Sequence, residues 1–269
     1  MKGNLNVQLK SFLLSSLNNF ILAKKHRINT LDSFRVNYIG ETIFRQSSHK
    51  IVFGPFKGVE IPEALASTSP SWCAGWILGT FEQQLLKFIT SKRWKSVVNI
   101  GAAEGYYPVS LLKTGYALKA IAFESLEVER SKIKLFSELN EVENKILIMG
   151  HADSNFLDTI NVKGFASGPN LMIVDIEGAE FDLFDLNLMR KLKDFHVVIE
   201  VHNFVVQEMT RINSFIKLIS RYHKIEIVTE NSRNIPSREE ISFLSRRDLM
   251  LIIAEDRPSD MFWILATPK

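Results

Sequence analysis

Acidic and small residues follow a series of apolar segments in this sequence, at positions where they could bind and activate a ligand. Gly101-Ala-Ala-Glu-Gly105 follows the first apolar segment, Glu124 the second and His151-Ala-Asp153 the third. Asp175-Ile-Glu-Gly-Ala-Glu180 and Glu200-Val-His-Asn203 follow the fourth and fifth. The carboxyl ends of parallel strands meet at one edge of a sheet, and ligands bind there. The pattern therefore predicts a single site at that edge.

The first of these segments fits a loop that lies close to a ligand. Gly101 and Gly105 carry no side chain, and a helix that follows offers unpaired amide donors. Glycines at this position also serve packing alone, so both interpretations stay open. Glu124 lies 23 residues after Gly101, and a carboxylate at the end of the second strand can accept hydrogen bonds from both hydroxyls of a ribose. The alternative for Glu124 is a solvated strand end.

A nucleoside without phosphates fits this loop better than a dinucleotide. The dinucleotide fingerprint is Gly-x-Gly-x-x-Gly, whereas here Ala103 stands in place of the middle glycine and Glu104 would repel a pyrophosphate. S-Adenosylmethionine is such a nucleoside. The loop after the third strand then lies near the adenine, where Asp153 or the amide of Ala152 can read the edge of the base.

Transfer of a methyl group from this cofactor to a hydroxyl needs a base that removes the hydroxyl proton. His202 is the candidate, because it ends the fifth strand beside Asp175 and its ordinary pKa of about 6.5 suits the task. A structural histidine is the alternative. A second mechanism uses Asp175, Glu200 and Asn203 as oxygen ligands for Mg2+, which would lower the pKa of the acceptor.

From about residue 79 the chain alternates apolar segments with helical patterns, which is typical of an α/β fold with a doubly wound, mostly parallel sheet. Seven strands are expected, at Ser96–Gly101, Lys119–Phe123, Lys145–Met149, Leu171–Asp175, His196–Val201, Lys224–Thr229 and Phe262–Ala266. Helices are expected at Tyr106–Lys113, Glu127–Leu139, Phe181–Leu192, Gln207–Ser220 and Ser245–Ala254. Glu177 and Glu180 should cap the helix that follows them, and His196 should be structural.

The segment before residue 79 predicts an N-terminal appendage of helices and a hairpin. Apolar residues recur at helical spacing from Leu5 to Phe20 and indicate an amphipathic helix that packs on the main domain or contacts a membrane surface or a second copy. The segment 51–61 is typical of a hairpin around Gly54 and Gly58. Trp72 and Trp76 fill the interface with the main domain or stack on a sugar. An appendage of this kind commonly covers an active site.

The composition narrows the class of protein only a little. With 33 basic and 30 acidic residues among 269, the formal net charge of +3 argues against nucleic acid as the main partner. Cys73 is the single cysteine, so no disulfide framework can form, which suits a cytoplasmic protein. No apolar stretch approaches the roughly 20 residues that a transmembrane helix needs.

Several segments resemble the FkbM-type methyltransferases, within the class I S-adenosylmethionine-dependent methyltransferase superfamily. The resemblance covers roughly residues 50–269, and its most specific part is the segment 175–180 after an apolar strand. Asn99 and Ala103 depart from the pattern of the class, which often has an acidic residue and a glycine at these positions. The other matching segments are 54–58, 78–82, 98–107, 199–202 and Arg257-Pro258 followed by Trp263.

The resemblance implies a Rossmann-like methyltransferase domain at residues 79–269 and an appendage at residues 1–78. It also implies O-methylation of a hydroxyl on a small metabolite or saccharide, with a homodimer formed through the N-terminal region as a further expectation. The alternative is a catalytically silent scaffold that keeps the fold. The cofactor-binding residues expected from pattern and resemblance together are Glu82, Asn99, Gly101, Ala102, Glu104, Gly105, Tyr106, Glu124, Ser125, Ala152, Asp153 and Asp175.

Overall fold

The structure is a computed structural model that describes residues 30–152, 156–162, 168–203, 205, 209–230, 233–237, 241–254 and 261–269. The amphipathic helix expected before residue 21, Asp153 and the Arg257-Pro258 pair lie outside the described residues. The predicted homodimer and the predicted division after residue 78 are not tested by this structure and stay predictions.

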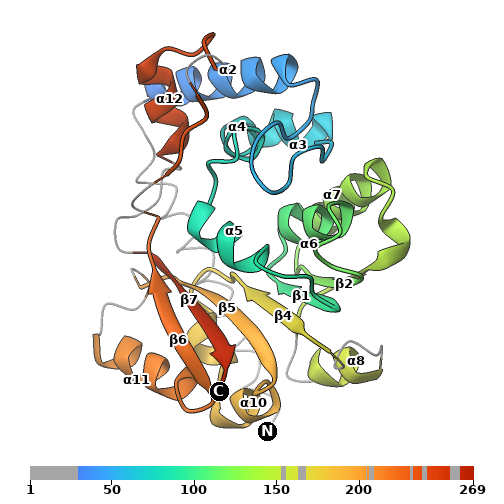
Figure 1. The fold of residues 1–269 in the computed structure, drawn as a ribbon, viewed down its shortest axis with the longest axis vertical. Helices are drawn as coiled ribbons and strands as arrows, with labels where there is room; N and C mark the ends of the chain where they lie inside the picture. Colours follow the sequence, from blue (N-terminus) through green and yellow to red (C-terminus); the bar gives the residue numbers. More distant parts are fainter. Residues whose placement is uncertain are drawn as a thin grey trace, which may run out of the picture.

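The described residues form a mixed α/β fold around a seven-stranded sheet, in the order β3-β2-β1-β4-β5-β7-β6 (Figure 1). Strands β1 to β6 run parallel, whereas β7 is antiparallel to both of its neighbours, β5 and β6. This is the doubly wound, mostly parallel α/β architecture that the sequence predicted. The strands are β1 (Ser96–Ile100), β2 (Ala120–Phe123), β3 (Ile146–Met149), β4 (Asn170–Val174), β5 (Phe195–Val201), β6 (His223–Val228) and β7 (Phe262–Pro268).

Alternate residues of the central strands face two separate hydrophobic layers, because successive side chains of a strand point to opposite faces. Val97 belongs to the layer that includes α5 (Gln83–Ile89), α6 (Tyr106–Lys113) and α7 (Glu127–Leu139). Val98 belongs to the layer on the other face, with α8 (Phe156–Val162), α10 (Leu186–Lys191) and α11 (Met209–Ile219). Strands β1 and β4 are buried at every residue, which explains their continuous apolar sequences.

The single helix predicted at Phe181–Leu192 is wrong, because the structure has two short helices there. Helix α9 (Glu180–Leu183) ends before Phe184, whose side chain is buried in the core with an extended backbone. Asp185 then caps α10, since its carboxylate accepts a hydrogen bond from the N–H of Leu188 at 2.6 Å. A short acidic side chain that bonds to the backbone favours a helix start over a helix interior.

The layer above the sheet contains helices that the sequence patterns did not predict, namely α2 (Thr30–Gln46), α3 (Glu63–Thr68), α4 (Pro70–Ile77) and α5. The segment predicted as a hairpin is a compact turn with a single bridge between Lys50 and Glu60. Helix α12 (Arg246–Ile253), from the connection between β6 and β7, packs in this layer against α2 and α4 (Figure 1). Within the described ranges no helix has both the length and the apolar character needed to cross a membrane.

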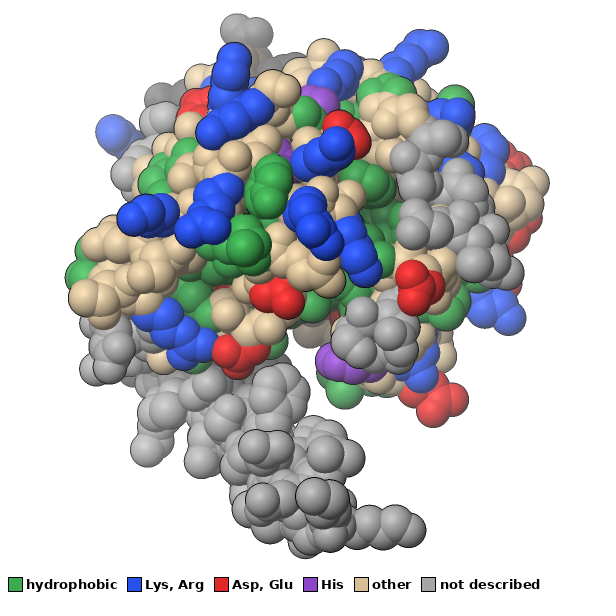
Figure 2. Space-filling view, turned by 90° about the horizontal axis from the view of Figure 1, so that it is seen from below, with side chains coloured by type: hydrophobic (Ala, Val, Ile, Leu, Met, Phe, Trp, Pro, Cys, Tyr) green, Lys and Arg blue, Asp and Glu red, His purple; other side chains and the backbone are tan. Residues whose placement is uncertain are grey.

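The amino edge of the sheet is basic, and it lies opposite the edge at which β1, β4 and β5 end. Seen from this side, Lys and Arg side chains are spread over the surface among apolar ones (Figure 2). Cations on this face are therefore separated from the acidic carboxyl edge by the length of the strands. Exposed basic residues that precede or begin strands β1, β5 and β6 are Lys92, Arg93, Lys95, Lys191, Lys193, Arg221 and Lys224.

His196 lies near the start of β5, at this basic edge, and takes part in packing, as the sequence predicted. Its Nε2 is 2.6 Å from Lys92 Nζ, and its ring meets the ring of Trp94 edge-on at a centroid distance of 5.0 Å. Burial, together with the charge of Lys92, lowers the pKa of His196 to about 4. The neutral ring is therefore the form that the fold stabilises.

We expect the contribution of His196 to stability to be complete above pH 6.5 and to be lost as the pH falls through 4, because its pKa is lower in the folded chain than in the unfolded chain. Since the ring is only half-buried, the loss should be about 1 kcal/mol, well below a direct conversion of the pKa shift. Urea unfolding at pH 7, 5.5 and 4 would show a smaller pH dependence in His196→Gln. Equal slopes in both proteins would contradict this expectation.

Candidate functional site

Strands β4 and β5 are parallel neighbours, and their carboxyl ends bring together Asp175, Glu200 and His202. Atoms of these three side chains that could each bind a metal all lie within 4.8 Å of one another. His202 Nε2 is 3.5 Å from Asp175 Oδ1 and 3.6 Å from Glu200 Oε2. Glu177, on the turn after β4, places Oε2 3.5 Å from the same nitrogen. The structure thus groups the predicted catalytic pair with one of the predicted metal ligands.

Hydrogen bonds to the buried carboxylate of Glu180 hold this arrangement in place. Its side chain is fully buried and accepts hydrogen bonds from the N–H groups of Gly178 and His202, each at 2.8 Å. The oxygen that binds the His202 N–H also lies 3.3 Å from Nδ1 of the same residue. Glu180 begins α9, but its main role is to join the turn after β4 to the end of β5. This leaves Nε2 of His202 facing the other carboxylates.

Burial and neighbouring charges shift the pKa values of Asp175, Glu200 and His202. Burial raises the pKa of Asp175, and His202 opposes that shift. Burial, Asp175 and Glu82 raise the pKa of Glu200 well above its ordinary value. Burial alone would lower the pKa of His202, but the hydrogen bond to Glu180 and the charge of Asp175 outweigh burial and raise it to about 9. His202 therefore carries a proton at neutral pH in this arrangement.

A protonated imidazole cannot accept a further proton, which bears directly on the predicted role of His202. Four carboxylates, those of Asp175, Glu177, Glu180 and Glu200, lie within 3.6 Å of its ring nitrogens. The raised pKa values of Asp175 and Glu200 show that negative charge is unfavourable here, so a further cation would stabilise the ionised carboxylates. His202 can act as a base only after such a cation lowers its pKa.

The loop after β1 uses its amide groups internally. The N–H groups of Gly101 and Ala102 both donate to the carbonyl of Phe123, at 2.9 and 3.0 Å, and the N–H of Gly105 donates to the carbonyl of Ala102. The N–H of Ala103 donates to Glu124 Oε2 at 3.0 Å. A pyrophosphate would need amide donors that point outward. The loop is therefore unsuited to a dinucleotide, which agrees with the sequence interpretation but for a further reason.

The two glycines of this loop serve packing, which was the alternative left open by the sequence. A Cβ on Gly101 would overlap the carbonyl oxygen of Asp175, and one on Gly105 would lie 3.1 Å from the side chain of Ile133. Both residues have positive φ. Gly101 thus lets the first loop lie directly against the backbone that carries Asp175. Ala103 also has a positive φ, of 44°, so the departure from glycine at this position costs some strain.

Glu124, which follows β2, is buried and connects the loop after β1 to the segment that follows β2. Besides the N–H of Ala103, its carboxylate accepts the N–H of Leu126 at 2.8 Å and the hydroxyl of Ser125 at 3.3 Å. Each carboxylate oxygen has more than one acceptor position, so Glu124 retains capacity for a ribose hydroxyl. The alternative of a solvated strand end is wrong, because the residue is only 8% exposed.

Four expected cofactor residues have side chains that serve packing or internal hydrogen bonds. The carboxylate of Glu104 faces Ser69 Oγ at 3.4 Å, and burial raises its pKa. The ring of Tyr106 stacks on Trp76 at a centroid distance of 4.5 Å, so this tryptophan fills the interface, as one of its two interpretations predicted. Ala102 is buried in the core. Asn99 donates to the carbonyl of Ile173 at 3.4 Å, between β1 and β4.

Glu82 and Glu230 show how the upper layer meets the site. Glu82, expected from the resemblance alone, is buried just before α5, and its charge contributes to the raised pKa of Glu200. Glu230 follows β6 and accepts the N–H groups of Gln84 and Leu85 at the start of α5. Sequence reasoning missed Glu230, although an acidic residue directly after a strand was a usable signal. Asn203 follows His202, and its Oδ1 is buried with no hydrogen-bond partner among the described residues.

Comparison with known proteins finds solved structures of similar architecture but gives no information on the acceptor. No family model and no curated protein matches the sequence. A precorrin-6Y C5,15-methyltransferase from Geobacter metallireducens overlaps over 70% of this chain and 90% of its own, with 10% identity and a TM-score of 0.45. TrmK of M. capricolum, solved with S-adenosyl-homocysteine, overlaps over 71% of this chain and 69% of its own, with 10% identity and a TM-score of 0.42.

A candidate tRNA (m1A22) methyltransferase from Streptococcus pneumoniae, solved with S-adenosyl-L-methionine, overlaps over 69% of this chain and 73% of its own, with 14% identity and a TM-score of 0.42. At these identities the likeness concerns the architecture of the sheet. The acceptors of those enzymes say nothing about the acceptor here, and the narrower resemblance to FkbM-type enzymes stays a prediction.

Gly101→Ala tests the contact between the first loop and the backbone of Asp175. We expect it to destabilise the fold by about 3 kcal/mol or more, because the added Cβ meets a backbone oxygen that cannot turn away. Gly115→Ala is the matched control, since its φ of 75° is similar but nothing lies within 4 Å of the added atom; it should cost only about 1 kcal/mol. Urea unfolding would measure both, and equal losses would contradict the proposed contact.

Proposed function

We propose that this protein is an S-adenosylmethionine-dependent methyltransferase that methylates a hydroxyl group. The observation that carries the proposal is the convergence of Asp175, Glu177, Glu180 and Glu200 on His202 at the carboxyl edge, where a cation is favoured. The adjoining loop has its amides bonded internally and suits a nucleoside without phosphates. A sulfonium nucleoside combines these two properties, which NAD and ATP do not.

The residues present fit this cofactor in both its parts. Glu124 would hold the ribose, since its buried carboxylate closes the loop after β1 and keeps acceptor capacity. Asp175 and Glu200 would stabilise the positive charge near the sulfur. When bound, the cofactor supplies an electrophilic methyl group. Ala152 lies in the loop after β3, where the adenine is expected.

Asp175 and His202 then act on the acceptor. A cation within the cluster lowers the pKa of His202, because it opposes the carboxylates that had raised it. With the methyl group supplied by the cofactor, the neutral Nε2 would take the proton of the acceptor hydroxyl. Glu180 holds Nδ1 and so keeps Nε2 directed at the acceptor. Positioning of the acceptor supplies much of the remaining rate.

A divalent metal ion is a second candidate for the same cluster. Asp175, Glu200 and His202 would hold it, and Glu180 would orient the imidazole as a carboxylate partner commonly does for a metal-bound histidine. Such an ion would lower the pKa of the acceptor hydroxyl. The sequence interpretation named Asn203 as the third ligand, whereas the structure groups His202 with Asp175 and Glu200. A nitrogen ligand broadens the choice from Mg2+ to Mn2+ and Zn2+.

Binding of S-adenosylmethionine, measured by calorimetry, is the first test. We expect saturable binding that Glu124→Ala weakens by roughly tenfold to a hundredfold, since it removes a charged hydrogen-bond acceptor. Asp175→Asn should weaken binding of S-adenosylmethionine more than binding of S-adenosylhomocysteine, because the latter lacks the positive charge. Glu143→Gln, at an exposed carboxylate before β3, is the control. Absence of binding would favour the catalytically silent scaffold.

Titration with Mn2+, followed by paramagnetic resonance, tests the metal. We expect His202→Ala and Asp175→Asn each to weaken Mn2+ binding by about tenfold or more, as the loss of a ligand commonly does. Glu143→Gln should leave it unchanged. If the wild-type protein binds S-adenosylmethionine but shows no specific Mn2+ site, the cluster serves the cofactor and the acceptor without a metal.

A further inference from the structure

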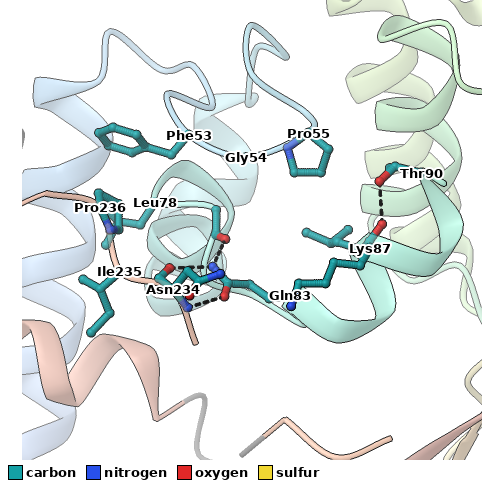
Figure 3. Close-up of a pocket in the computed structure, with 12 residues that line it drawn as sticks. Phe53, Gly54, Pro55, Leu78, Gln83, Lys87, Thr90, Asn234, Ile235 and Pro236 are labelled. Atoms are coloured by element: carbon teal, nitrogen blue, oxygen red, sulfur yellow. Dashed lines mark hydrogen bonds between the residues drawn. The ribbon is translucent and has the colours of Figure 1, made fainter. Parts of the chain in front are cut away.

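A cavity of about 460 Å3 lies beneath the turn 53–55 and beside helix α5. Phe53, Pro55 and Leu78 form one side, Ile235 and Pro236 a second, and Lys87 stands across from them (Figure 3). Small-molecule sites commonly have volumes of about 300–1,000 Å3 and largely apolar walls. The cavity is therefore large enough for a molecule in addition to the cofactor, whose residues lie elsewhere.

The cavity adjoins the carboxyl edge at which the carboxylate cluster lies. Strand β6 is parallel to β5, so the segment that follows β6 emerges at the same edge. From this segment Glu230 binds the start of α5, and residues 234–236 line the cavity. Gln83 lines the cavity and directly follows Glu82, whose charge acts on Glu200. The segment before α5 thus contributes both to the cavity lining and to the electrostatic surroundings of Glu200.

The walls of the cavity are held in place before any ligand arrives. The side-chain amide of Gln83 donates to the carbonyls of Gly79 and Asn234, at 2.6 and 2.7 Å, and accepts the N–H of Asn234 at 2.6 Å (Figure 3). A Cβ on Gly79 would lie 2.8 Å from the backbone of Phe53, so the two wall segments touch directly. A preformed cavity lowers the entropic cost of binding.

The polar groups of the lining favour a particular kind of ligand. Gln83 uses both ends of its amide, and the Thr90 hydroxyl donates to the carbonyl of Leu86 at 2.6 Å. A saccharide would need several polar partners that these groups no longer offer. Lys87 Nζ donates one hydrogen bond, to Gln84 at 3.2 Å, and no described carboxylate lies within 4 Å of it. Apart from these groups and the side chain of Asn234, the lining is largely apolar, and it includes one cation, Lys87.

We propose that this cavity binds the methyl acceptor, and that the acceptor is a small hydroxylated carboxylic acid with an apolar, preferably aromatic, body. Its carboxylate pairs with Lys87, its body lies between Phe53, Leu78 and Pro236, and its hydroxyl is directed at the cluster. This inference rests on the proposed methyltransferase function. It narrows the acceptor that the sequence resemblance implied, a small metabolite or a saccharide, to the first of these.

Binding of para-hydroxycinnamate to the full chain, with its neutral methyl ester and methyl glucoside as comparisons, tests the proposal by calorimetry and ligand-observed magnetic resonance. We expect para-hydroxycinnamate to bind best. Lys87→Gln should weaken it about tenfold, as loss of a charged hydrogen bond does, and leave the ester unaffected. Ile235→Trp should block both, since it fills the cavity from its rim. Lys57→Gln, at an exposed lysine outside the lining, should change nothing.

S-Adenosylmethionine affinity, measured in every variant, separates this proposal from the proposed function. The cavity proposal stands if the cofactor binds alike in all variants while para-hydroxycinnamate depends on Lys87. It is overturned if methyl glucoside binds better, or if Lys87→Gln and Ile235→Trp leave binding of para-hydroxycinnamate unchanged. If para-hydroxycinnamate binds as expected while the wild-type chain binds no cofactor, the methyltransferase assignment fails, and with it the role of the cavity as an acceptor site.

Discussion

The buried carboxylate of Glu180 joins the two strand ends on which the candidate site depends. It accepts N–H groups from the turn after β4 and from the end of β5, and it also holds the imidazole of His202. A buried carboxylate is stabilised when several donors satisfy it. Because these donors come from two strands, Glu180 converts their parallel pairing into a fixed relation between Asp175 and His202. Without this link, the cluster would be only a set of acidic residues on adjacent loops.

The first loop depends on the same region from the other side. Gly101 lies against the carbonyl of Asp175, so the loop after β1 and the cluster share a backbone contact. Above them, the stack of Trp76 on Tyr106 attaches the upper layer to the helix that follows the loop. The loop after β1, the cluster and the upper layer are thus connected by two contacts, one between backbone atoms and one between rigid rings. This explains how irregular segments keep a defined geometry.

The sequence predicted the strands well because their signal is local. Runs of buried apolar residues and the acidic residues behind them identified the sheet and the edge at which Asp175 and His202 meet. The break between α9 and α10 was missed, because an apolar period continues across Asp185 and conceals its capping role. The charge state of His202 could not be predicted, since it depends on carboxylates that the fold brings from the segment 175–180 to the end of β5. Hydrogen bonds across the fold, such as that of Gln83 with Asn234, leave no local pattern.

Helix α12 gives the upper layer a double attachment. The chain leaves the sheet after β6, contributes α12 to the layer that contains α2 and α4, and returns as β7 between β5 and β6. Arg35 of α2 and Asp248 of α12 form an ion pair at 2.6 Å within this layer. The upper layer is consequently built from two parts of the polypeptide that lie far apart in the sequence. A change of the upper layer during evolution would have to alter two distant parts of the sequence together, which restricts how freely this layer can be exchanged through one segment alone.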